Sequence, residues 1–330
     1  MAVNLLADMA STKKIKVEDV LRLRREVFQD GLVSRAEAES LFALDASHGA
    51  KPQEWTVFFL EALTDYVLYQ EQPEGYVSQE TSEWLINAIS HNGEVDTSTE
   101  LELLVRLLEK ARSAPSSLSS YALKQVADAV LDGSGPLANG RELEPGRISK
   151  AEVDLMRRIL FAAGGEANIG VTRAEAEILF VLNDRTATAA NDPSWTDLFV
   201  KAIANSMLCA SGYSAPSREE ALKQSTFLDS PGAGLGGFFS RMISGGLSGF
   251  RDAYQRGGDG LDAAFAQRNA LNTAKSASAE QVDAAEAKWL ADQIGKDGRL
   301  HHNERELLKF VKEMSPDIHE DLKPLLDKVA

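Results

Sequence analysis

The sequence predicts an all-α protein that contains two copies of one helical domain. Apolar residues recur at helical spacing, as in Leu101, Leu104, Val105 and Leu108. Short helix-capping motifs occur throughout the chain, and long stretches of its first half reappear in its second half. No segment shows the strict alternation of a half-buried strand bounded by hairpin turns. With 330 residues, the chain is long enough for two domains with cores of their own.

The internal similarity predicts the domain organisation. "SRAEAESLFALD" begins at Ser34, and "TRAEAEILFVLND" begins at Thr172. A tryptophan-led apolar helix follows each of them, from Trp55 and from Trp195. Further along, "WLINAISHNGEVDTSTELELL" resembles "WLADQIGKDGRLHHNERELL". The predicted division is an N-terminal segment 1–15, copy one 16–131, a Gly- and Pro-containing linker 132–147, and copy two 148–330 with an insertion 214–281.

A capping motif marks the predicted junctions between helices. It consists of a glycine, an aliphatic residue two positions later, a capping residue, and a glutamate three positions after the cap. Ser34 with Glu37 and Thr172 with Glu175 are capping boxes, in which the hydroxyl and the carboxylate each accept a backbone N–H. The glycine provides the turn that ends the preceding helix. Each copy of the motif therefore predicts helix, tight turn, helix.

The two tryptophan-led helices are expected to be the central buried helices of their domains. They are apolar on nearly every side, which is typical of a helix surrounded by others. Before the second one, Asp192 is a predicted N-cap and Pro193 stands at the first helical position. The only cysteine, Cys209, lies in this second apolar run and is expected to be a buried small hydrophobic residue.

The net charge and the hydropathy of the chain make some classes of binding partner unfavourable. The formal net charge of −15 disfavours nucleic acid and anionic membrane surfaces, because both repel an acidic protein. No apolar run is long enough to cross a bilayer, and the N-terminal stretch makes a poor secretory signal. A cytoplasmic protein is therefore expected. "GAGLGG" at 232–237 matches a dinucleotide motif by letter, but it lacks the βαβ context and is interpreted as linker.

The stretch "IGKDGRLHHNERELLKF" raises the question of a metal site. The spacing of Gly298, Leu300 and Glu304 resembles the glycine, aliphatic residue and final glutamate of an EF-hand loop. That resemblance implies Asp297 and Glu304 as metal ligands, but Gln293 and Gly295 stand where further acidic ligands are needed. A weaker candidate pair with the same spacing is formed by Asp30 and Glu37. The competing interpretation is that these glutamates only cap helices.

The same C-terminal stretch resembles a second family. "IGKDGRLHHNERELLKFVKE" is similar to the TerB-like (tellurite-resistance) family of small acidic helical domains. The resemblance covers about 50 residues well. It implies a helical metal-binding or signalling module.

The insertion carries an apolar helical stripe. In "GGFFSRMISGGLSGFRDAYQRGG" the apolar residues recur every three or four positions, which is one face of a helix. The stripe consists of Phe239, Ile243, Leu247, Phe250 and Tyr254, with Phe238 and Met242 beside it. Glycines within the same stretch disfavour an isolated helix. The stripe is therefore expected to pack against something, either its own domain, a partner protein, a second copy or a membrane surface.

These patterns lead to two functional hypotheses. The first is a non-enzymatic cytoplasmic interaction or signalling module that contacts its partner through the insertion. The second is a divalent-cation sensor or buffer. No catalytic constellation or cofactor motif is recognisable in the sequence, so no enzymatic activity is predicted.

Overall fold

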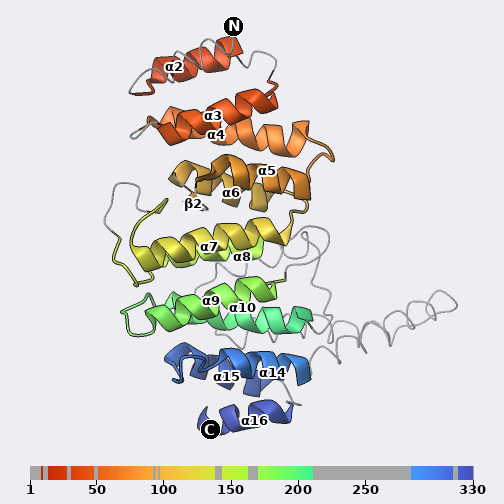
Figure 1. Ribbon diagram of the computed structural model, residues 1–330, viewed down its shortest axis with the longest axis vertical. Coiled ribbons are helices and arrows are strands. Elements are labelled where there is room, and N and C mark those ends of the chain that lie inside the picture. Colours follow the sequence, from red (N-terminus) through yellow and green to blue (C-terminus); the bar gives the residue numbers. More distant parts are fainter. Residues whose placement is uncertain are drawn as a thin grey trace, which may run out of the picture. The chain divides into compact units, whose positions relative to one another are not determined.

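The all-α prediction is confirmed by the structure, a computed structural model (Figure 1). The structure describes residues 9, 14–27, 31–47, 51–91, 94–95, 97–137, 143–162, 170–210, 284–314 and 319–329. Within these residues the only strands are a two-residue antiparallel pair that pairs Ser90 with Val95 and His91 with Glu94.

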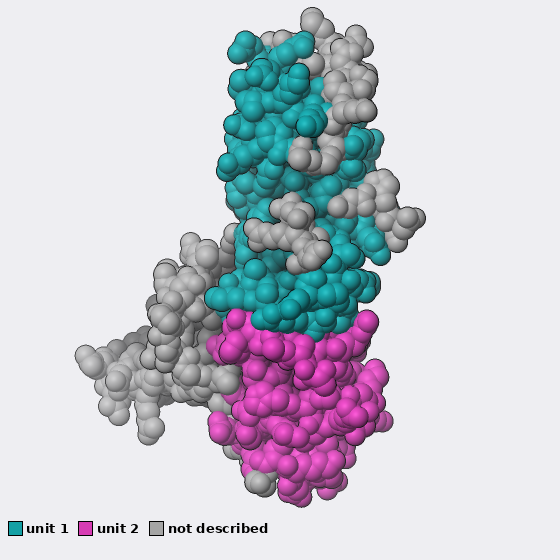
Figure 2. All heavy atoms as spheres, turned by 90° about the vertical axis from the view of Figure 1, so that its left-hand side faces the viewer, with its two compact units in different colours: residues 1–169 teal, residues 170–330 magenta. Residues whose placement is uncertain are grey.

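The chain divides into two compact units, residues 1–169 and 170–330 (Figure 2). The first unit contains α2 (Val17–Arg22), η1 (Leu23–Val27), α3 (Arg35–Ser47), α4 (Gln53–Asp65), η2 (Tyr66–Gln70), α5 (Gln79–Ile89), β1 (Ser90–His91), β2 (Glu94–Val95), α6 (Ser98–Lys110), α7 (Ser116–Asp132) and α8 (Lys150–Ala162). The second contains α9 (Arg173–Thr186), α10 (Ser194–Ala210), α14 (Ala284–Gln293), α15 (His302–Met314), η3 (Glu320–Leu322), α16 (Lys323–Leu326) and η4 (Asp327–Val329).

The first unit is a stack of helices in two layers (Figure 1). One layer runs from α3 to α5 to α7, and the other from α2 to α4 to α6 to α8, each helix contacting the next in its layer. The segments η1 and η2 continue α2 and α4 directly as short π-helical turns. Stacking of this kind lets each helix bury one face against its neighbours, as in helical repeat proteins.

The second unit repeats this kind of packing. Helix α9 contacts α10, α10 contacts α15, and α14 contacts η3. The tryptophans that begin α4 and α10 are among the largest fully buried side chains. Phe42 meets Phe59 edge-on at 5.5 Å, and Phe180 meets Phe199 edge-on at 5.2 Å. Edge-on aromatic pairs of this kind contribute roughly 0.5–1.5 kcal/mol beyond the burial of their area.

Capping motifs form the junctions, as the sequence indicates. At the start of α9, Thr172 Oγ1 accepts from Glu175 N at 3.3 Å while Thr172 N donates to the Glu175 carboxylate at 2.8 Å. The same reciprocal pair joins Thr97 to Glu100 at the start of α6. Gly146 takes a φ of 74° in the turn before α8, a conformation in which most other residues are strained.

The compact units do not coincide with the two sequence copies. The sequence assigns residues 148–330 to copy two, whereas α8 packs against α6 and α7 of the first unit. Arg158 of α8 donates to both Glu102 and Glu109 of α6, at 2.7–3.0 Å. The helix that opens the second copy in sequence therefore completes the first unit in space. The predicted insertion, 214–281, lies outside the described residues.

Candidate functional site

The predicted metal ligand Glu304 is a capping and turn-closing residue. Its side chain is fully buried at the start of α15. One carboxylate oxygen accepts from the N–H of Gly295 at 2.9 Å, and the other accepts from the N–H of His301 at 2.7 Å. Both oxygens are therefore bonded to backbone donors of the turn between α14 and α15, which lowers their capacity to bind a cation.

The second predicted ligand, Asp297, lies in the same turn and pairs with a histidine. Its carboxylate accepts from Arg299 N at 2.9 Å and contacts His301 Nε2 at 2.8 Å. The hydrogen bond from His301 is the main cause that lowers the pKa of Asp297 below its usual value. Helix α15 therefore begins at a small cluster of polar side chains that includes Asp297, His301 and Glu304.

Asp184, near the end of α9, adds a third carboxyl group to this cluster. Partial burial is the main cause that raises its pKa to about 6, and the charges of Glu304 and Asp297 add to this effect. Its Oδ1 atom is shielded from solvent and has no hydrogen-bond partner among the described residues. Sequence reasoning missed Asp184 because it lies more than 100 positions before Asp297. Within the described residues, no three His, Cys, Asp or Glu side chains are arranged to hold a metal ion.

The weaker predicted pair is only partly described. Glu37 accepts from Ser34 N at 2.9 Å and from Ser34 Oγ at 2.7 Å, which makes it the capping glutamate of α3. Asp30 lies outside the described residues. The seven apolar residues of the insertion stripe lie outside them as well.

A buried polar network in the first unit was not anticipated from the sequence. The Asp45 carboxylate is fully buried and accepts from Trp55 Nε1 at 2.6 Å and from Thr97 Oγ1 at 2.5 Å. Lys51 Nζ lies 2.9 Å from the same carboxylate. Three donors from three places in the chain thus compensate one buried charge, which joins α3, α4 and the start of α6.

The corresponding position in the second unit is neutral. Asn183 aligns with Asp45, and its side-chain oxygen accepts from Asn303 Nδ2 at 2.8 Å. Asn303 in turn accepts from Thr196 Oγ1 at 2.6 Å. Trp195 aligns with Trp55, but its buried indole N–H has no hydrogen-bond partner among the described residues. At corresponding positions, the first unit therefore buries a carboxylate and the second buries a neutral amide.

A second arrangement recurs in both units at the surface. In the first unit, Arg35 stacks on the ring of Trp84 at 5.0 Å, and Trp84 Nε1 donates to Glu39 at 3.1 Å. In the second, Arg173 stacks on Trp289 at 5.0 Å, and Trp289 Nε1 donates to Glu177 at 3.3 Å. These contacts join α3 to α5 and α9 to α14. Both tryptophans are half-buried, so their main role is to attach one helix to the next.

Exposed apolar side chains are concentrated in the first unit. Six large apolar side chains are exposed in the described part of the chain, and five of them lie near its start. These five, named here the apolar patch, are Val17, Leu21, Leu32, Val57 and Tyr69. The sixth is Val181, on α9 of the second unit. Concentration of exposed apolar side chains is a common sign of an interaction surface.

Specific contacts bring the parts of the patch together. Residues 57, 61, 65 and 69 follow one side of the continuous helix α4–η2 at four-residue spacing. Arg24, one turn after Leu21, binds Glu61 at 2.6 Å, which links α2 to this side of α4. Gln70 donates to Gly31 O at 3.1 Å and accepts from Val33 N at 2.8 Å, which places the turn containing Leu32 beside η2.

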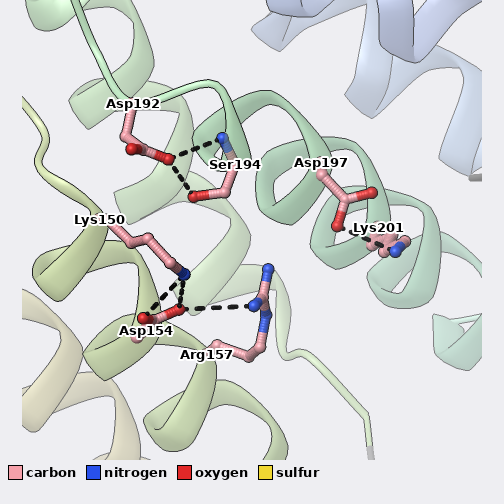
Figure 3. Close-up of polar contacts among 7 residues, drawn as sticks. All are labelled: Lys150, Asp154, Arg157, Asp192, Ser194, Asp197 and Lys201. Carbon is pink, nitrogen blue, oxygen red and sulfur yellow. Dashed lines mark hydrogen bonds and ion pairs between the residues drawn. The ribbon is translucent and has the colours of Figure 1, made fainter. Parts of the chain in front are cut away.

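The start of α10 and the side of α8 are held by short-range contacts (Figure 3). Asp192 accepts from the backbone N–H and the hydroxyl of Ser194, which supports its predicted capping role. Lys201 pairs with Asp197 one turn earlier in α10. On α8, Asp154 pairs with Lys150 and Arg157. Each of these ion pairs joins two residues of the same helix.

Comparisons with known proteins add no family to this description. No family model, no curated protein and no solved structure matches the chain. Among the described residues, none of the helices has the length and apolar character needed to cross a membrane.

Proposed function

We propose that this protein is a non-enzymatic cytoplasmic interaction module. The observation that carries the proposal is the apolar patch, because Leu21 and Val57 are each about half exposed, at 51% and 50%, on adjacent helices. The apolar stripe of residues 238–254 is the second proposed contact surface, on the basis of its sequence pattern. The resemblance to TerB-like domains is consistent with a signalling role and remains a prediction.

The architecture supports this proposal through the roles of its polar groups. Glu37 and Glu304 cap helices, and three donors compensate the buried charge of Asp45 inside the fold. Stacked helical proteins commonly bind partners along the surfaces that their helices present. The side chains exposed on the described surface are therefore sufficient for binding a partner protein.

Affinity purification of tagged full-length chain from its own cells tests the proposal. The double substitution Leu21→Glu with Val57→Glu, and separately the deletion of residues 231–258, should remove proteins that the unaltered chain retains. Val181→Glu is the matched control, because this valine is equally exposed, at 51%, in the second unit. An unchanged set of retained proteins in both altered chains would contradict the proposal.

The second candidate function is a divalent-cation sensor. One observation favours it: burial is the main cause that raises the pKa of Asp184 to about 6, the negative charges of Glu304 and Asp297 add to this effect, and a cation would relieve that added repulsion. This function requires that a bound ion compete with the backbone N–H groups that donate to the Glu304 carboxylate. An ion at a hundred times its dissociation constant would stabilise the protein by about 2.7 kcal/mol. Thermal unfolding with Ca²⁺, Mg²⁺ or Zn²⁺ that shows no shift, or a shift that survives Asp184→Asn, would contradict this candidate.

A further inference from the structure

We infer that α2–η1 of one copy of this chain binds α15 of a second copy, with Arg25 of the first placed between Glu306 and Glu313 of the second. The contact joins two separate molecules, whatever the arrangement of the units within each. The inference goes beyond the proposed function, because its partner is the same chain and its contacts are charged. It rests on an ion-pair cluster that the chain already forms inside its first unit.

Arg158 is the centre of that internal cluster and joins α8 to α6. Its guanidinium donates to both carboxylate oxygens of Glu109, at 2.7 and 3.0 Å, and to both of Glu102, at 2.9 and 3.0 Å. The two glutamates are seven residues apart on α6, which is about two helical turns, so both lie on one side of the helix. Two bidentate contacts of this kind fix the orientation of two helices as well as holding them together.

Arg25 has the same place in α2–η1 that Arg158 has in α8. Each is the second residue of an Arg-Arg pair, and each follows its helix cap, Lys16 or Ser149, by nine positions. The neighbouring helices differ, because α8 contacts α6 and α7, which precede it, whereas α2 contacts α4, which follows it (Figure 1). Arg25 is exposed and has no ion-pair partner among the described residues. It is therefore available to a partner molecule.

Glu306 and Glu313 have the same places on α15 that Glu102 and Glu109 have on α6. In both helices the two acids follow the capping residue by five and twelve positions. Glu313 is exposed and Glu306 is half-buried. Among the described residues, Glu306 pairs only with Lys309 of its own helix, and Glu313 has no ion-pair partner. An arginine from another molecule can thus take the place beside these acids that Arg158 takes on α6.

The rest of the α15 surface determines what kind of contact this is. Where α6 buries Leu101, Val105 and Leu108, α15 exposes Arg305, Lys309 and Lys312. The first turn of α2 carries Glu18 and Asp19, whose charge is opposite to that of these bases. The two surfaces are therefore complementary in charge and lack the apolar side chains of the internal junction. Exposed ion pairs are weak and are screened by salt, so the association should be weak and salt-sensitive.

The association is head-to-tail, because the two surfaces are different. A pair of copies still has one free α2–η1 surface and one free α15 surface. Further copies can therefore add until a ring closes.

Sedimentation velocity of the purified full-length protein tests the inference, at concentrations that reach about 1 mM so that a weak complex is detected. Species larger than one chain should increase with concentration and should decrease when NaCl is raised to about 0.5 M. Arg25→Glu should weaken the association at least about tenfold, because like charges would meet. Arg185→Glu is the matched control and should leave it unchanged, since Arg185 is also exposed and has no ion-pair partner among the described residues.

Reversal of the charges on both surfaces is the second part of the test. Glu306→Arg with Glu313→Arg should weaken the association as strongly as Arg25→Glu does, and one chain that carries all three changes should associate again. Removal of the charges tests the geometry. A mixture of an Arg25→Ala chain with a Glu306→Gln, Glu313→Gln chain should form a complex of two chains and nothing larger, because only one pair of intact surfaces remains.

Three results would overturn the inference. These are a chain that stays monomeric at every concentration, an association that Arg25→Glu leaves unchanged, and a triple variant that does not associate again. Each of them concerns the purified chain alone. They therefore leave the proposed function to its own test, which depends on the other proteins that the chain retains.

Discussion

At the scale of single residues, the two units differ most at Asp45 and Asn183. These residues occupy corresponding places after matching sequence motifs, yet one is a buried charge and the other a neutral amide. The indole N–H of Trp55 helps to compensate the charge of Asp45, whereas that of Trp195 has no partner in the described residues. A hydrogen bond to a buried charge contributes more to stability than one between neutral groups.

This difference predicts unequal effects of one substitution. Trp55→Phe removes a donor from a buried carboxylate and should lower the free energy of unfolding by about 1–2 kcal/mol more than Trp195→Phe does. Both variants lose similar aromatic volume, so each controls for the packing cost of the other. Denaturant unfolding of the two variants measures the difference. Equal losses would show that the indole of Trp55 contributes only through its volume.

Asp184 predicts a pH dependence with a defined sign. Its folded-state pKa of about 6 lies above the usual value of 3.8, so the folded state binds the proton more tightly than the unfolded state. The contribution of Asp184 to stability is therefore present below about pH 4 and is lost as the pH rises through 6. Asp184→Asn should stabilise the protein at pH 7.5 by about 1 kcal/mol, since partial exposure screens the full cost, and should change little at pH 4.

Asp297 provides a control of opposite sign for this experiment. Its pKa is lowered, so its contribution is present above its usual pKa and is lost as the pH falls through the lowered value. Asp297→Asn should therefore destabilise the protein at pH 7.5. Thermal unfolding of both variants across this pH range makes the comparison. If both substitutions stabilised the protein at neutral pH, the opposite contributions assigned to Asp184 and Asp297 would be wrong.

At the scale of elements, the junctions between helices were predictable and the contacts between distant helices were not. The capping pairs Ser34 with Glu37 and Thr172 with Glu175 join residues three positions apart, so the motif carries all the information. The contact of Asp45 with Thr97 joins residues 52 positions apart, and that of Asn183 with Asn303 joins residues 120 positions apart. No local pattern specifies such pairs, because they depend on how the helices stack.

The attachment of α8 to α6 belongs to this second class and predicts a measurable effect. Hydrogen bonds from Arg158 to Glu109 and then to Glu102 raise the pKa of its guanidinium above the usual value. Arg158→Ala should lower stability by about 1–2 kcal/mol and increase amide hydrogen exchange in residues 150–162. Lys150→Ala is the control, because Lys150 pairs with Asp154 of its own helix. Equal exchange in the two variants would mean that Arg158 does not hold α8.

At the scale of the whole molecule, the sequence repeat and the compact unit are different divisions of the chain. The repeat predicts a new domain at residue 148, but α8 buries Val153, Met156 and Ile159 within the first unit. A repeated sequence records which segments resemble one another, whereas a compact unit depends on which apolar faces meet. The role of Glu304 shows the same limit, since its spacing in the sequence cannot reveal that both its carboxylate oxygens accept from backbone N–H groups.

The division predicts which fragment folds. Residues 1–169 should unfold cooperatively, whereas residues 1–147 should be less stable by at least about 3 kcal/mol, because the apolar face of α8 is missing. Circular dichroism during denaturant unfolding of the two fragments measures this difference. A fragment 1–147 that is as stable as 1–169 would show that the first unit is complete without α8.

Three amide side chains have a consequence for the behaviour of this protein in acid. Gln70, Gln125 and Asn205 each accept from the N–H of the valine that lies one to two residues before a helix cap, at 2.7–2.8 Å. Amides neither gain nor lose protons over the physiological range. These three hydrogen bonds at the starts of helices are therefore the same at neutral and at acidic pH. A response of these helices to acidification must therefore arise elsewhere, and Asp184, whose pKa is raised to about 6, is such a place.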